Sequence, residues 1–243
     1  MPDSTIERAA NREIIARSFP SSVTARDAVA HHYAVEHDLK RSALYVEVNP
    51  SNRKLEAWAA VCQTGMDLFR PLVVMRAENG DALQRVLRRA LMPNRQYLVS
   101  APVALHDDII LICSLHGEQV NMIHALDRAE FVPVVNILVQ GNMTPDGKLR
   151  ATIRARDGLP AAEAGTNWQG AKFAELFVQV QEGARLRGLG KSVLSAVCAQ
   201  LFEMQRQPIY LAGSSNIASS RLAERVGFRD SGGRELTGAI NLK

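Results

Sequence analysis

The sequence QEGARLRGLGKSVLSAVCAQL, residues 181–201, places three glycines and three basic residues directly before an apolar helical pattern. The apolar residues recur at helical spacing, and they are Val193, Leu194, Val197, Cys198 and Leu201. Such a face packs one side of a helix onto a sheet. Glycines at a helix start let backbone N–H groups approach a ligand, and the positive end of the helix attracts anions. The stretch therefore predicts a strand, a phosphate-binding loop and a helix.

Three phosphate loops can be compared by their spacing. A Walker loop, G-x-x-x-x-G-K-S/T, would need a glycine where the chain has Arg185. The dinucleotide pattern G-x-G-x-x-G would need a glycine or alanine at Val193. A third pattern, Q/R-x-x-G-x-G/A, is met at every fixed position by Arg185, Gly188 and Gly190. The spacing favours this third loop.

A second motif follows in NIASSRLAERVGF, residues 216–228. It matches the order N-x-x-A/S-x-x-L-Y-x-K/R-x-G-F at Asn216, Ser219, Leu222, Arg225, Gly227 and Phe228. With strands expected at residues 172–180 and 209–212, the two motifs resemble the GNAT superfamily of acyl-CoA-dependent N-acyltransferases. The resemblance is clear over residues 172–229 and looser from about residue 131 onward. One departure is Ala223, where the family pattern has tyrosine.

The resemblance implies acetyl-CoA as co-substrate and no metal. The strand before the loop would hold the pantetheine arm, and the loop amides would hold the diphosphate. The cofactor-binding residues expected from the resemblance are Val178, Val180, Arg185, Arg187, Gly188, Leu189, Gly190, Lys191, Asn216 and Ser219.

The activity implied is transfer of an acetyl group to a primary amine by direct attack on the thioester. Glu175 is the candidate base, because it stands on the central strand where many family members carry an acid; a cross-strand pairing role is the alternative. Tyr210, on the neighbouring strand, is a candidate acid in place of the tyrosine lost at Ala223, and a packing role is the alternative. That loss leaves a second function open, a catalytically inactive acyl-CoA-binding or regulatory module.

The expected fold class is α/β, with a mixed twisted sheet and helices on both faces. We expect a GNAT-like domain over residues 121–243 and an α/β domain over residues 1–120. In the latter, residues 72–100 repeat strand, helix and strand without the glycine motif. This suggests a degenerate, GNAT-derived half, as in tandem members of the glycine N-acyltransferase type.

Other segments are expected from composition and periodicity. Helices are predicted over most of the first 40 residues and over 54–69, and strands over 42–48, 108–115 and 132–140. Residues 159–170 are predicted as a loop, in which Trp168 is either an exposed residue that closes over substrate or a packing residue.

Bulk properties limit the function classes. The chain has 243 residues, of which 47% are hydrophobic and 22% charged, as in a globular protein. A net charge of +4 suits an anionic ligand, whereas aromatics at 5% argue against a dedicated nucleic-acid surface, which stays a remote alternative. No signal peptide or membrane span is expected.

The three cysteines show no C-x-x-C spacing, and no HExxH pattern occurs, so no metal site is predicted and a reducing, cytoplasmic compartment is favoured. The acceptor is expected to be a small-molecule amine or a peptide amine, and a homodimer is left open.

Overall fold

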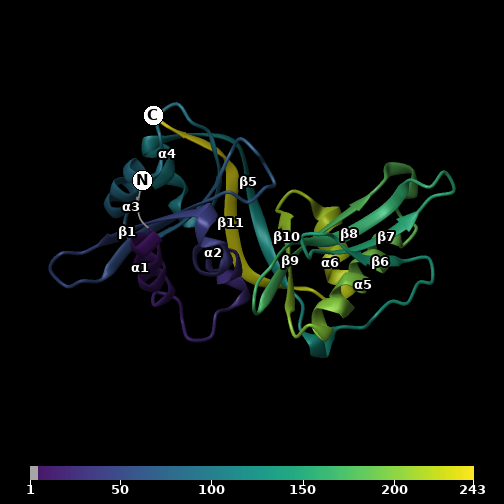
Figure 1. Cartoon of the computed structure of the whole chain (residues 1–243). Coiled ribbons are helices and arrows are strands. Elements are labelled where there is room, and N and C mark those ends of the chain that lie inside the picture. Colours follow the sequence, from purple (N-terminus) through teal and green to yellow (C-terminus); the bar gives the residue numbers. More distant parts are fainter. Residues whose placement is uncertain (1–4) are drawn as a thin grey trace. The chain divides into compact units, whose positions relative to one another are not determined.

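The computed structural model describes residues 5–243 (Figure 1). The chain divides into two compact units. The first unit is Met1–Asn121 with Gly233–Lys243, and the second is Met122–Gly232. Strands β5 (Cys113–Ala125) and β11 (Arg229–Leu242) contribute residues to both. Each unit combines helices with a mixed sheet, which confirms the predicted α/β class.

In the first unit the strand order is β1-β2-β3-β4-β11-β5. Its other strands are β1 (Ser42–Val48), β2 (Leu55–Cys62), β3 (Leu72–Ala77) and β4 (Tyr97–Pro102). Its helices are α1 (Thr5–Ala16), α2 (Ala28–His31), α3 (Gly80–Ala90) and α4 (His106–Ile112). Short helical turns lie at η1 (Ala25–Asp27), η2 (His32–Glu36), η3 (Leu39–Arg41) and η4 (Val103–Leu105). Strands β3 and β4 are parallel and are joined through α3, which is the predicted strand, helix and strand.

Two predictions in the first unit are wrong. Of the residues predicted as a helix at 54–69, Leu55–Cys62 form β2 and the rest are irregular chain. Both faces of β2 are buried, so no polar alternation marks the strand: Ala57 and Ala59 join the core cluster beneath α3, and Trp58 is also buried. Residues predicted as a strand at 108–115 form α4 up to Ile112. The run of isoleucines resembles a strand, yet Ile109 and Ile112 are the buried pair, and their spacing of three is helical.

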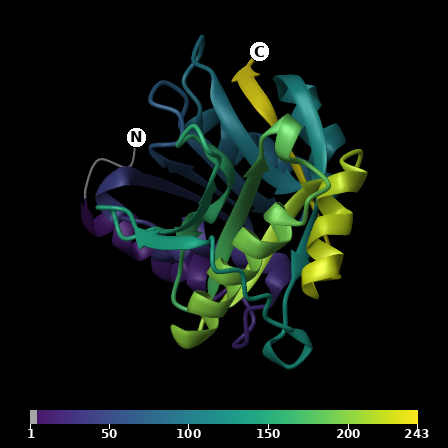
Figure 2. The ribbon, with the colours of Figure 1, turned by 90° about the vertical axis from the view of Figure 1, so that its right-hand side faces the viewer.

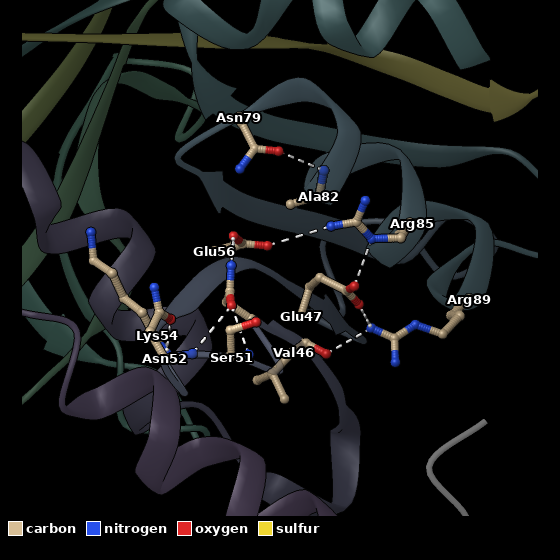
Figure 3. A network of polar contacts seen from close by, with 11 residues as sticks. Val46, Glu47, Ser51, Asn52, Lys54, Glu56, Asn79, Ala82, Arg85 and Arg89 are labelled. Carbon is tan, nitrogen blue, oxygen red and sulfur yellow. Dashed lines mark hydrogen bonds and ion pairs between the residues drawn. The ribbon is translucent and has the colours of Figure 1, made fainter.

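Helix α3 is bound to β1 and β2 by a polar network (Figure 3). Arg85 Nε lies 2.6 Å from Glu47 Oε1, and Arg89 Nη2 lies 2.7 Å from Glu47 Oε2. Asn79 caps the helix, because its Oδ1 accepts from Ala82 N at 2.9 Å. Both arginine side chains are about half exposed, so solvent screens these ion pairs and they add little to stability.

In the second unit the strand order is β5-β10-β9-β8-β7-β6. Its other strands are β6 (Gln140–Met143), β7 (Leu149–Arg154), β8 (Pro160–Gln169), β9 (Phe173–Val180) and β10 (Gln207–Gly213). Its helices are α5 (Leu189–Glu203) and α6 (Ile217–Val226), with turns η5 (Arg128–Glu130) and η6 (Glu182–Ala184). Both helices pack onto this sheet (Figure 2), where Val197 and Leu201 of α5 share a core with Ala223 of α6.

Two predictions in the second unit are also wrong. The expected loop at 159–170 is strand β8, and Trp168 is only 5% exposed. The expected strand at 132–140 is irregular chain up to Val139, in which Pro133 lacks the N–H that a sheet needs. That segment is held along α5, since Ser195 Oγ accepts from Val134 N at 2.8 Å. Across residues 5–243, no helix is both long and apolar enough to cross a bilayer.

Candidate functional site

The two parallel strands of the second unit separate partway along their length. Strands β9 and β10 pair from Phe173 with Gln207 to Leu176 with Tyr210, and then the pairing stops. Strand β9 continues beside β8 as far as Val180. A cavity of about 680 Å³ is lined by the ends of these strands, the glycine loop, α5 and α6. Carboxyl ends of parallel strands are a common place for ligands in open sheets.

The glycine loop has the backbone that its sequence requires. Gly188 has φ +76° and precedes α5, where no side chain caps the helix. A Cβ at Gly190 would lie 3.0 Å from Val180 Cγ2 and 3.3 Å from Leu222 Cδ2, so glycine lets α5 start close to β9 and α6. The first amides of α5 therefore face the cavity region without a side-chain partner, which suits an anion.

The cavity wall is strongly positive. Four basic side chains line it, and they are Arg185, Lys191, Arg221 and Arg225. No aspartate or glutamate is among the lining residues. Within residues 5–243, none of the four side chains has an ion pair or a hydrogen bond. One sign of charge in a recess raises the local concentration of a ligand of opposite sign, so the cavity suits a polyanion.

Comparison with known proteins gives a consistent result. The family model described as FR47-like protein matches residues 169–235. A GCN5-related N-acetyltransferase from Kribbella flavida is similar in structure, with a TM-score of 0.63 at 13% identity over 92% of this chain and 96% of that one. The chain has the GNAT fold. These likenesses support the GNAT superfamily.

Two further structural likenesses extend over nearly the whole chain. A Drosophila protein has a TM-score of 0.67 at 12% identity, covering 99% of this chain and 97% of its own. A tandem GNAT protein from the clavulanic acid biosynthesis pathway has a TM-score of 0.56 at 12% identity, covering 99% of this chain and 95% of its own. Among curated protein sequences, none matches significantly.

The cavity brings together most of the residues that match the two motifs, whereas Gly227 and Phe228 do not line it. All expected cofactor-binding residues except Arg187 line it. Asn216 caps α6, because its Oδ1 accepts from Ser219 N at 3.1 Å. Sequence reasoning missed Arg221 as a wall residue and gave Arg225 no role. Their spacing of four residues on a helix, which puts both on one face, was the available signal.

Tyr210 lies in the wall of the cavity, whereas Ala223 does not. The Tyr210 phenol is 2.7 Å from Ser219 Oγ. Burial raises the pKa of Tyr210, and the hydrogen bond with Ser219 opposes that rise. Ala223 is fully buried in the core with Val226 and Phe228. Thus the phenol that the GNAT pattern would supply from α6 is absent, and another phenol is present at the splay of the strands.

Glu175 is outside the lining of the cavity. Its Oε1 accepts from Asn167 Nδ2 at 2.7 Å, and its Oε2 accepts from Trp168 Nε1 at 2.6 Å. A bulge in β8 between Thr166 and Trp168 brings Trp168 opposite Glu175. Both carboxylate oxygens are thereby fixed by β8, and of the two roles expected for Trp168 the structure shows the packing one, as a buried partner of this acid.

Among the described residues that line the cavity, none is a cysteine, histidine, aspartate or glutamate. Residues 5–243 contain no group of three or more side chains suited to a metal. Cys62, Cys113 and Cys198 are all buried free thiols. Burial raises the pKa of Cys198, which leaves it protonated and unreactive at neutral pH.

Proposed function

We propose that this protein transfers an acetyl group from acetyl-CoA to a primary amine by direct attack on the thioester. The observation that carries the proposal is the unpaired basic cavity at the splay of two parallel strands, beneath an uncapped helix start. Its volume of about 680 Å³ lies within the usual range for a cofactor-sized ligand.

Each part of the cavity matches a part of coenzyme A. The amides at the start of α5, with Arg185 and Lys191 beside them, suit the diphosphate. Beyond Leu176, the edge of β9 has lost its partner β10. Its free N–H and C=O groups around Val178 and Val180 can pair with the amides of a pantetheine arm.

The chemistry needs a base for the amine and a proton for the leaving thiolate. The amine nitrogen attacks the thioester carbon, the C–S bond breaks, and an amide and free CoA thiol result. We assign the amine proton to Glu175 and the thiol proton to Tyr210. A phenol whose pKa is raised by burial stays protonated at neutral pH and can donate.

For the first unit we propose a degenerate, GNAT-derived half that binds no cofactor. Both halves of the chain run strand, helix, strand, helix, strand: β3-α3-β4-α4-β5 and β9-α5-β10-α6-β11. A Cβ at Gly80 would overlap Asp108 Oδ1, so the chain's own carboxylate stands at the start of α3. Asn79 caps that helix as well. The start of α5 can therefore attract an external anion, whereas the start of α3 already has Asp108 and Asn79 beside it.

A catalytically inactive acyl-CoA-binding module is the second candidate, because Ala223 removes the usual acid and Glu175 lies outside the cavity lining. Three buried free thiols fit a reducing compartment such as the cytoplasm in either case.

One experiment separates these functions. The purified chain is incubated with acetyl-CoA and a panel of primary amines and peptides, and release of free CoA thiol is followed beside equilibrium binding of acetyl-CoA. Amine-dependent thiol release supports the enzyme. Tight binding without turnover on any acceptor supports the inactive module, and absence of binding rejects both.

A further inference from the structure

The basic groups of the cavity lie on two separate walls. Arg185 and Lys191 belong to the glycine loop and the first turn of α5. Arg221 and Arg225 belong to α6 and line the same cavity. A single anionic group bound at the start of α5 would use the first pair, and the second pair would still lack a counter-ion.

The pair on α6 is unfavourable without a ligand. Arg221 and Arg225 are four residues apart, so their side chains are neighbours on one helix face. A like-charged pair at this spacing lowers helix stability. Neither guanidinium has an acidic partner among residues 5–243, although Glu224 lies on the same helix. Arg225 lies in the last turn of α6, where the negative end of the helix dipole stabilises its charge. Arg221 lies in the middle of the helix, so the dipole does not stabilise its charge in the same way.

We propose that Arg221 and Arg225 form a second anion subsite that recognises the 3′-phosphate of coenzyme A. The inference rests on the proposed function. Coenzyme A carries a diphosphate and, separately, a phosphate monoester on the ribose. Two guanidiniums one helical turn apart suit such a monoester, because each can donate paired hydrogen bonds to phosphate oxygens. The cavity then distinguishes coenzyme A from dephospho-coenzyme A, which lacks only that group.

The test compares both nucleotides by isothermal titration calorimetry. Wild-type protein is expected to bind coenzyme A more tightly than dephospho-coenzyme A, on the order of tenfold or more. The double variant Arg221→Gln with Arg225→Gln is expected to lose that preference by losing affinity for coenzyme A alone. The matched control on the other wall, Lys191→Gln, is expected to weaken both nucleotides by a similar factor.

A preference that survives in the double variant overturns the subsite, as does an equal loss of affinity for both nucleotides. If wild-type protein binds neither nucleotide, the proposed function itself fails, which is a different result. A folding defect is recognised by thermal unfolding of the free protein. Because the like-charged pair is removed, the double variant is expected to unfold at the same temperature as wild type or slightly higher.

Discussion

Trp168 donates its indole N–H to Glu175 Oε2 across 2.6 Å, while Asn167 donates to the second oxygen of the same carboxylate. A glutamine at this position can present only one acceptor oxygen, so its NH₂ group would face a donor. Removing the acid therefore changes both the charge and the local hydrogen bonding of β8 and β9. A test of Glu175 as base must separate these two effects.

Glu175→Gln is expected to lower kcat/KM by about 100-fold or more, the usual effect of losing a general base. The dissociation constant for acetyl-CoA should not change, because Glu175 is outside the cavity wall. Trp168→Phe is the matched control: it removes one donor and keeps the carboxylate, so a much smaller loss of kcat is expected. Full activity in Glu175→Gln would exclude Glu175 as the base.

Tyr210→Phe keeps the buried ring and removes the phenol that contacts Ser219. If this phenol protonates the leaving thiolate, kcat should fall by about 10- to 100-fold while the affinity for acetyl-CoA stays constant. Burial raises the pKa of Tyr210 above its ordinary value near 10, so the phenol remains protonated below about pH 10. The wild-type rate should thus rise with pH as the amine loses its proton, with no fall due to Tyr210 in that range. Unchanged kcat in Tyr210→Phe would mean that the thiolate leaves without this acid.

The motifs at residues 181–201 and 216–228 could be read from the sequence because they encode local backbone needs. Gly188 requires a positive φ, Gly190 a close approach, and Asn216 an N-cap. Contacts between side chains of different elements could not be predicted in this way, because they depend on how the elements pack. The contact of the Tyr210 phenol with Ser219 Oγ is one of them. Where both faces of a strand are buried, as around Trp58 in β2, the alternation that marks a strand is also missing.

Strand β8 illustrates a different cause. Its alanines, glycine and asparagine resemble a loop by composition, but Ala162 and Ala164 are small because α5 packs against them. Gly165 has no room for a side chain, since a Cβ there would meet Arg150 and the Leu149 carbonyl. Tertiary packing rather than strand propensity decides these residues.

Leu186 stores strain at the cavity rim. It has φ +61°, a conformation unfavourable for a branched side chain, and that side chain is fully exposed. Leu186→Gly is expected to raise the free energy of unfolding by up to about 1 kcal/mol, measured by denaturant titration. The same change at Leu138, which is exposed but has no positive φ, should lower it slightly. Destabilisation by Leu186→Gly would mean that the loop conformation is not strained.

His37 should make the stability of the first unit depend on pH. Burial, aided by His32 and Arg41, lowers its pKa from 6.5 to about 4. Ser42 Oγ donates to the Asp38 carbonyl, so neutral His37 donates from Nδ1 to Ser42 Oγ at 2.9 Å. Between pH 6.5 and 4 the unfolded state binds a proton at His37 that the folded state excludes. The contribution of neutral His37 to the free energy of unfolding is therefore complete above pH 6.5 and is lost as pH falls toward 4. Thermal unfolding from pH 7.5 to 4 should show a shallower decline for His37→Gln than for wild type, and parallel curves would contradict the assignment.

The number of cofactor sites tests the difference between the two helix starts. The start of α3 is met by Asp108 and capped by Asn79, whereas α5 has neither an acid nor a side-chain cap. Calorimetric titration with acetyl-CoA should therefore give one site per chain. Gly188→Trp introduces a large side chain at a positive φ in the only loop with the glycine pattern, and binding should fall to an undetectable level. Gly147→Trp is the matched change at an exposed glycine that also has a positive φ and open space around it, and it should leave the single site occupied. Two sites in wild type, or binding that survives in Gly188→Trp, would show that the first unit binds the cofactor after all.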